Sequence, residues 1–136
     1  MKLEDQVCSL ELAKKLKELG IKQNSLFYWC NVKNWEYKSV LRYCPENIDR
    51  ELALSGFAIS AFTVAELGEM LPQNHADWMI GYSKENGNQW HLWLHSSCAY
   101  LEDKTIAIKD VNESNARAKM LIHLIEQGLI NVKDLK

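Results

Sequence analysis

The sequence lacks the features that mark membrane-spanning or secreted proteins. No stretch reaches the roughly 18 apolar residues that a membrane-spanning helix needs. Residues 1–5 turn acidic before any apolar run develops, so we expect no secretory signal. The Cys count is 4, the cysteines are widely spaced, and there is no CxxC pair, which favours reduced thiols over a disulfide framework. We therefore expect a cytoplasmic protein without membrane association.

The sequence also lacks a strong excess of charge. The formal net charge is −2, from 16 basic and 18 acidic side chains. Proteins that bind duplex DNA usually carry a basic excess, because Lys and Arg displace counterions from phosphates. We therefore expect no duplex nucleic acid as partner. With 136 residues, 47% of them hydrophobic, the chain is predicted to fold as a single domain.

Recognisable catalytic motifs are absent as well. The sequence contains no GxSxG, P-loop, GxGxxG or HExxH pattern. On a strand, His91 and His95 would be separated by roughly 13 Å, which is too far to share one zinc ion. We expect a binding protein rather than an enzyme, with no cofactor and no metal. A small hydrolase that uses Cys98 or a histidine stays open as an alternative.

Three segments carry polar N-caps and end at a glycine or, for the short central one, at Pro72, as helices do. They are an N-terminal helix of about ten residues that follows Ser9 and ends at Gly20, a short helix Val64–Leu71 with a capping box of Thr63 and Glu66, and a C-terminal helix that begins near Asn112 and ends at Gly128.

Runs rich in aromatic and β-branched residues lie between these helices and predict strands. They are residues 25–32, 35–43, 78–83, 89–95 and 105–108, with Lys33-Asn34 as a two-residue turn between the first two. The nearly uncharged residues 52–62 fit either a strand or a helix. Because adjacent hairpins pair antiparallel, we predict an α+β fold in which the three helices pack on a largely antiparallel sheet.

The clearest hairpin joins residues 78–83 to residues 89–95 through Asn86-Gly87, a favoured turn dipeptide. A two-residue loop would place Tyr82 opposite His91. Because side chains alternate between the two faces of a strand, one set of residues from both strands would then share a face. That set is Trp78, Ile80, Tyr82, His91, Trp93 and His95. The other face is more aliphatic and suits the core better. A slip of one residue would reverse these assignments.

The aromatic face must be covered by a helix, a second subunit or a ligand, and a sheet buried on both faces is one alternative. Stacking of a base on an aromatic side chain contributes about 1–3 kcal/mol. We therefore predict a set of ligand-binding residues on this face. They are Trp78, Tyr82, His91, Trp93 and His95.

A phosphate contact is predicted at the start of the last helix. Asn115 and Arg117 lie where free N–H groups and the helix dipole favour an anion. Arg42, near the end of the second strand, is a further candidate. The alternative is that Arg117 is an ordinary solvated residue, and the sequence does not show whether the phosphate site lies near the aromatic face.

Three stretches of the chain resemble a group of small uncharacterised proteins encoded by phages, prophages and other mobile elements. They are CSLELAKKLKELGIKQNSLFYW (8–29), SAFTVAELGEMLP (60–72) and NARAKMLIHLIEQGLI (115–130). The resemblance implies a phage setting and hence a place in the host cytosol. Small non-enzymatic phage proteins often serve as inhibitors, and among them are sponges that sequester the nucleotide signals of bacterial immunity.

Our leading hypothesis is a phage-type anti-defence protein, homo-oligomeric and non-enzymatic, that sequesters a small nucleotide-like ligand. The alternative is a protein–protein interaction module that inhibits or assists a host or phage protein through its aromatic sheet face. Aromatic anchors and arginine are enriched in protein interfaces too, so the same residues serve both hypotheses.

Overall fold

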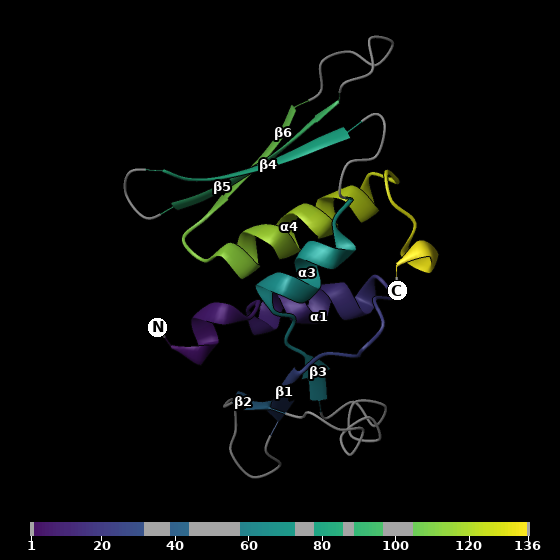
Figure 1. Cartoon of the computed structure of the whole chain (residues 1–136). Coiled ribbons are helices and arrows are strands. Elements are labelled where there is room, and N and C mark those ends of the chain that lie inside the picture. Colours follow the sequence, from purple (N-terminus) through teal and green to yellow (C-terminus); the bar gives the residue numbers. More distant parts are fainter. Residues whose placement is uncertain are drawn as a thin grey trace.

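Helices occupy the middle of the molecule, and a small antiparallel sheet lies at each end (Figure 1). The computed structural model describes residues 2–31, 39–43, 58–72, 78–85, 89–96 and 105–135. The helices are α1 (Leu10–Glu18), α3 (Val64–Met70) and α4 (Glu113–Glu126), with short 3-10 turns η1 (Leu3–Gln6) and η3 (Val132–Asp134). None of the helices among these residues has the length and apolar character that a bilayer crossing requires. The predicted α+β class and the three helices are confirmed.

Helix α1 is bounded by hydrogen bonds that its own sequence provides. At its start, Ser9 Oγ accepts a hydrogen bond from the backbone N–H of Leu12 at 3.5 Å. At its end, Gly20 adopts φ +93°, and the N–H of Ile21 donates to the carbonyl of Leu16 at 3.1 Å, as in a Schellman motif. Leu16 and Ile21 are both buried, so this end is also a hydrophobic contact. The predicted cap and terminal glycine are confirmed.

Glu66 fixes the short helix α3 and ties it to another part of the chain. Thr63 Oγ1 accepts a hydrogen bond from the N–H of Glu66 at 3.2 Å, and Glu66 Oε2 accepts one from the N–H of Thr63 at 2.7 Å. This reciprocal pair is the predicted capping box. Glu66 also accepts hydrogen bonds from Ser25 Oγ and the N–H of Leu26, both at 3.0 Å. The carboxylate therefore joins α3 to the segment that precedes the first strand.

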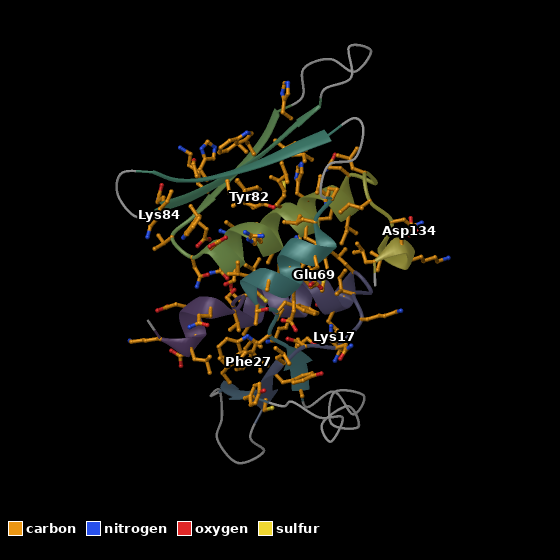
Figure 2. All side chains as sticks on the ribbon, in the orientation of Figure 1. Lys17, Phe27, Glu69, Tyr82, Lys84 and Asp134 are labelled. Atoms are coloured by element: carbon orange, nitrogen blue, oxygen red, sulfur yellow. The ribbon has the colours of Figure 1, made fainter. Side chains whose placement is uncertain are left out.

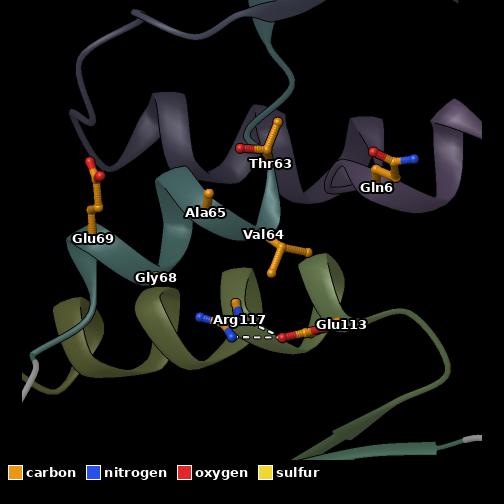
Figure 3. Close-up of a pocket in the computed structure, with 8 residues that line it drawn as sticks. All are labelled: Gln6, Thr63, Val64, Ala65, Gly68, Glu69, Glu113 and Arg117. Carbon is orange, nitrogen blue, oxygen red and sulfur yellow. Dashed lines mark hydrogen bonds and ion pairs between the residues drawn. The ribbon is translucent and has the colours of Figure 1, made fainter.

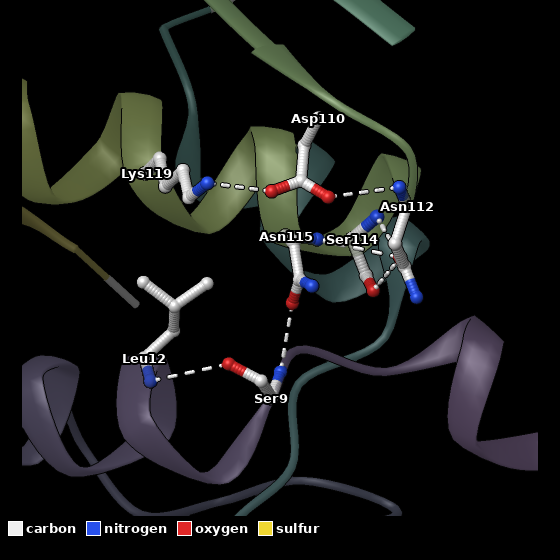
Figure 4. Close-up of polar contacts among 7 residues, drawn as sticks. All are labelled: Ser9, Leu12, Asp110, Asn112, Ser114, Asn115 and Lys119. Atoms are coloured by element: carbon white, nitrogen blue, oxygen red, sulfur yellow. Dashed lines mark hydrogen bonds and ion pairs between the residues drawn. The ribbon is translucent and has the colours of Figure 1, made fainter. Parts of the chain in front are cut away.

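Helix α4 starts at a tight turn whose polar groups are paired (Figure 4). The side chain of Asn112 accepts hydrogen bonds from backbone N–H groups of the first turn. Asp110 accepts one from the N–H of Asn112 at 2.9 Å and forms an ion pair with Lys119 at 2.6 Å. Gly128, with φ +70°, follows the helix. The predicted start and end of this helix are confirmed.

The strands form two separate sheets of three strands each. One has the order β2-β1-β3, built from β1 (Phe27–Asn31), β2 (Ser39–Tyr43) and β3 (Ala58–Ser60); the other has the order β4-β5-β6, built from β4 (Trp78–Glu85), β5 (Gln89–Ser96) and β6 (Thr105–Asp110). The segment whose structure the sequence left open thus contributes strand β3, while residues 52–57 lie outside the described part. The expected turn at Lys33-Asn34 also lies outside it.

The pairing of β4 with β5 differs by one residue from the pairing that a two-residue loop would give. Ser83, not Tyr82, is opposite His91. The last pair before the connection is Glu85 with Gln89, so residues 86–88, which lie outside the described part, separate the paired strands. The predicted register is therefore wrong.

This shift exchanges the two faces of β4 and leaves those of β5 unchanged, because side chains alternate along a strand. Trp78 and Tyr82 occupy positions on the helix side of the sheet, whereas His91, Trp93 and His95 lie on the opposite side. The prediction that these five residues share one face is wrong. The prediction that the aliphatic face of β5 forms core is confirmed, since Leu92 and Leu94 are fully buried.

The main core lies between the β4-β5-β6 sheet and the helices. Even-numbered strand residues pack against buried side chains of α4, which contacts β5 and β6 directly. From the sheet come Ile80, Tyr82, Trp90, Leu92, Leu94, Ile106 and Ile108, and from the helices Leu16, Leu67, Met120, Leu121 and Leu124. The sheet therefore has one face on the core and a second face directed away from it.

Candidate functional site

The outer face of the β4-β5-β6 sheet is the first candidate site. It consists of the odd-numbered residues of the three strands and lies on the side of the sheet that the helices do not cover (Figure 1). On the central strand, Trp93 is opposite Gly81 of β4 and opposite Ala107 of β6. Trp93 is partly exposed and lies outside the hydrophobic cluster that the described residues form. Its large ring thus stands between two of the smallest side chains.

The indole ring of Trp93 lies over the backbone of Gly81. A Cβ atom at position 81 would come within 2.2 Å of Cε2 and 2.3 Å of Cζ2 of that ring, so only glycine leaves room for it. Ala107, on the other side of Trp93, is exposed. The ring therefore leans toward β4, and the exposed Ala107 lies next to Trp93 on β6.

A polar row runs across the same face beside this apolar one. His91 is opposite Ser83 of β4 and Lys109 of β6. The imidazole of His91 lies 5.5 Å from the ring of Trp93, centroid to centroid, with the planes tilted by 58°. His95, also partly exposed, occupies the next outer position of β5. The outer face thus carries three aromatic side chains along its central strand.

Tyr82, predicted to join this aromatic face, lies instead between the sheet and α4 (Figure 2). The guanidinium carbon of Arg117 is 4.3 Å from the centre of the Tyr82 ring, which is a cation–π contact. Trp78 is opposite Ser96, at a helix-side position of the register. The sheet therefore separates Tyr82 from Trp93, and Trp78 has the same even-numbered parity in the register as Tyr82.

Arg117 lines a second candidate site, an open pocket of about 620 Å³ between η1, α3 and α4 (Figure 3). Nη2 of Arg117 lies 2.6 Å and Nε 3.0 Å from Oε1 of Glu113, one helical turn earlier. Both side chains are largely buried, at 15% and 20% exposure. A Cβ at Gly68 of α3 would lie 2.6 Å from Nη1 of Arg117. The guanidinium is thus held by a carboxylate, a ring and a helix backbone.

Asn115, the other predicted phosphate residue, connects α4 to the N-terminal segment. Its Oδ1 accepts a hydrogen bond from the N–H of Ser9 at 2.8 Å (Figure 4). The neighbouring Cys8 donates its N–H to Phe62 and accepts a hydrogen bond from Trp29 Nε1 on its carbonyl. The amide oxygen of Asn115 therefore completes the hydrogen bonding of a buried extended segment.

The predicted ligand residues do not form one cluster. Arg42 is opposite Tyr28 in the other sheet, at the far end of the molecule (Figure 1). Arg117 and Asn115 lie on the helix side of the β4-β5-β6 sheet, away from Trp93. The structure brings His91, Trp93 and His95 together on the outer face, and Tyr82 and Arg117 together on the helix side, 4.3 Å apart. Sequence analysis missed Ser83 and Lys109 on the outer face. Lys109 was missed because the strand predicted at residues 105–108 ended one residue before it, and Ser83 because the predicted register was wrong by one residue.

Nucleophilic and metal chemistry have few candidates among the described residues. Burial raises the pKa of the Cys8 thiol from 9.0 to about 11, which keeps it protonated near neutral pH. No group of three or more His, Cys, Asp or Glu side chains gathers in the described ranges as a metal site needs. Cys98 lies outside those ranges.

Comparisons with known proteins add no relative to this picture. No protein-family model matches the chain, no curated protein matches it, and no solved structure matches its fold.

Proposed function

We propose that the chain is a non-enzymatic binding protein that takes a small nucleotide-like ligand on the outer face of the β4-β5-β6 sheet. The observation that carries the proposal is the position of Trp93, whose ring lies over Gly81 and beside exposed Ala107. A planar base stacks on such a ring with about 1–3 kcal/mol.

The geometry favours this face over the predicted phosphate site on α4. Arg117 is already paired with Glu113, whose Oε1 lies 2.6 Å from Nη2 in a largely buried pair, and this neighbouring negative charge disfavours a phosphate there. Asn115 accepts a backbone hydrogen bond from Ser9, so its oxygen supports the fold. We therefore centre the proposal on Trp93 and its neighbours.

In the phage setting that the sequence resemblance implies, such a protein would sequester a signalling nucleotide. A thermal-shift screen against cyclic dinucleotides and ADP-ribose isomers tests this. Binding at 100 times Kd adds about 2.7 kcal/mol of stability, which raises Tm by about 9 °C for a chain of this length. Ligand recovered unchanged after heat denaturation would distinguish sequestration from hydrolysis.

Variants at Trp93 test where the ligand binds. We expect Trp93→Ala to weaken binding by about 5- to 150-fold, the equivalent of one stacked base. Trp93→Phe keeps an aromatic ring and should retain most of the affinity. Far-UV circular dichroism of both variants checks that the sheet is intact.

Two results would contradict the proposal. One is the absence of any nucleotide-dependent shift in Tm, and the other is unchanged affinity in Trp93→Ala. A host or phage protein that binds the wild type but not Trp93→Ala, with no nucleotide effect, would favour the interaction-module alternative. A dimer in which the second copy covers Trp93 would also count against the ligand hypothesis, because the ring would then not be accessible to a ligand.

A further inference from the structure

We infer that the row Ser83–His91–Lys109 is a phosphate subsite next to the Trp93 stacking surface, so that the ligand is a nucleotide rather than a free base or nucleoside. The inference rests on the proposed function, and it replaces the phosphate contact that the sequence placed on α4. It follows from the register of the three strands, which aligns one residue of each strand in this row.

The chemistry of the row suits an anion. It combines a hydroxyl, an imidazole and an ammonium group, all of which can donate hydrogen bonds. Ser83 and His91 are partly exposed and Lys109 is exposed, so a ligand on the surface can reach all three. Glu85 of β4 takes the next outer position beyond Ser83, so the carboxylate-bearing residue of this face belongs to the edge strand opposite the one that carries Lys109.

The spacing of the two rows suits a nucleotide. Residues two apart on a strand are separated by about 7 Å, and opposite residues of neighbouring strands by about 5 Å. The row Gly81–Trp93–Ala107 therefore lies about 7 Å from the row Ser83–His91–Lys109, which leaves space for a ribose between a base and its phosphate. A base against Trp93 would place its sugar above the space between the rows and its phosphate near Lys109.

The contrast between the two rows explains why one ligand would need both. The Trp93 row consists of an indole ring between glycine and alanine, which suits an apolar plane but carries no charged group to pair with a phosphate. The His91 row offers donors, and the exposed ammonium of Lys109 gives a weak site alone because solvent screens it. A molecule with a base and a phosphate uses both rows at once.

Substitution of Lys109 tests the subsite with a matched control on the same sheet. We would measure Kd by calorimetry at low ionic strength for AMP, GMP, CMP, UMP, cyclic di-GMP and the corresponding nucleosides. Lys109→Gln should weaken binding of the best nucleotide about tenfold, as loss of one charge-assisted hydrogen bond from an exposed ammonium, reduced by solvent screening, implies. Binding of its nucleoside should not change.

Lys84→Gln is the control, because it removes the same charge from the same sheet. Lys84 lies on the helix side of the register, with Nζ 5.8 Å from the ring of Trp90. We expect wild-type affinity for the nucleotide in this variant. Equal losses in Lys84→Gln and Lys109→Gln would indicate a general effect of net charge and would overturn the inference.

The test separates failure of this inference from failure of the proposed function. If nucleoside and nucleotide bind equally well and both depend on Trp93, the stacking site stands and the phosphate subsite does not. If none of the probes binds, both are wrong. If the nucleotide binds more tightly than its nucleoside and only Lys109→Gln removes the difference, the subsite is supported.

Discussion

Replacing Gly68 by alanine should destabilise the protein, although alanine is the better helix former. Gly68 is buried in α3, and a Cβ there would lie 2.6 Å from Nη1 of Arg117 and 3.7 Å from Cζ. Comfortable contact between such atoms needs about 3.5 Å, so the guanidinium must retreat by about 1 Å. That movement strains its 2.6 Å contact with Glu113 and its position over the Tyr82 ring.

Opposing contributions decide the size of this effect. Alanine in place of glycine stabilises a helix interior by about 1 kcal/mol. A hydrogen bond to a charged group contributes about 1.5–3 kcal/mol, and a cation–π contact about 0.5–2 kcal/mol. If the shift of the guanidinium loses most of the hydrogen bond and part of the cation–π contact, Gly68→Ala lowers the free energy of unfolding by about 1–2 kcal/mol net. For a chain of this length, Tm should fall by about 3–7 °C.

The same substitution should change sign once Arg117 is shortened. In an Arg117→Ala background the added methyl group meets no guanidinium, so Gly68→Ala should stabilise by about 0.5–1 kcal/mol. Urea unfolding of the wild type, the two single variants and the double variant measures this coupling. If Gly68→Ala has the same effect in both backgrounds, the close approach of Arg117 does not explain the glycine.

Two further predictions concern buried polar groups. Cys8 ionises from about pH 9 in the unfolded chain and only near pH 11 in the folded one, so the unfolded state binds fewer protons between these pH values. The free energy of unfolding should therefore fall by about 3 kcal/mol in total across this range. Cys8→Ala should flatten this part of the profile of stability against pH. An unchanged profile would mean that Cys8 is not the cause. Glu66→Gln should cost about 1–2 kcal/mol in urea unfolding, because an amide nitrogen cannot accept the hydrogen bonds that Glu66 receives from Ser25, Leu26 and Thr63. The exposed Glu69→Gln on the same helix is its control and should stay within about 0.5 kcal/mol; equal losses would contradict the role of Glu66.

The sequence predicted the helix boundaries well because their causes are local. Ser9 and the Thr63–Glu66 pair bind backbone groups within three residues, and Gly20 and Gly128 follow the last turns of their helices. Such short-range chemistry is readable from the chain alone. The sequence also identified the α+β class, since consecutive strand signals between the helices indicate hairpins and hence antiparallel pairing.

The faces of the hairpin depended on the length of the loop between β4 and β5, and the sequence did not determine that length to within one residue. Asn86-Gly87 is typical of a two-residue loop, yet the pairing of Glu85 with Gln89 leaves three residues between the strands. The β4 residues whose side chains are described, 80–84, consequently lie on the faces opposite to those predicted. His91, Trp93 and His95 still share one face, as predicted, because all three are odd-numbered residues of the same strand.

The roles of Arg117 and Asn115 could not be predicted, because their partners lie far away in the sequence. Arg117 contacts Tyr82 and approaches Gly68, and Asn115 binds the N–H of Ser9. The ion pair of Arg117 with Glu113 was readable, since residues four apart on a helix are neighbours. It would have marked this arginine as already engaged.

The hydrogen bond between Ser9 and Asn115 has a consequence for the order in which the protein folds. It joins residues separated by 106 positions, and α1 also packs directly on α4. Contacts of such long range must overcome the entropy of closing a large loop before they contribute, and they slow folding. During synthesis, α1 leaves the ribosome well before α4, the helix on which it packs. The N-terminal segment can therefore contact Trp29 and Phe62 before α4 exists, whereas the part of α1 that packs on α4 stays uncovered until α4 has been made.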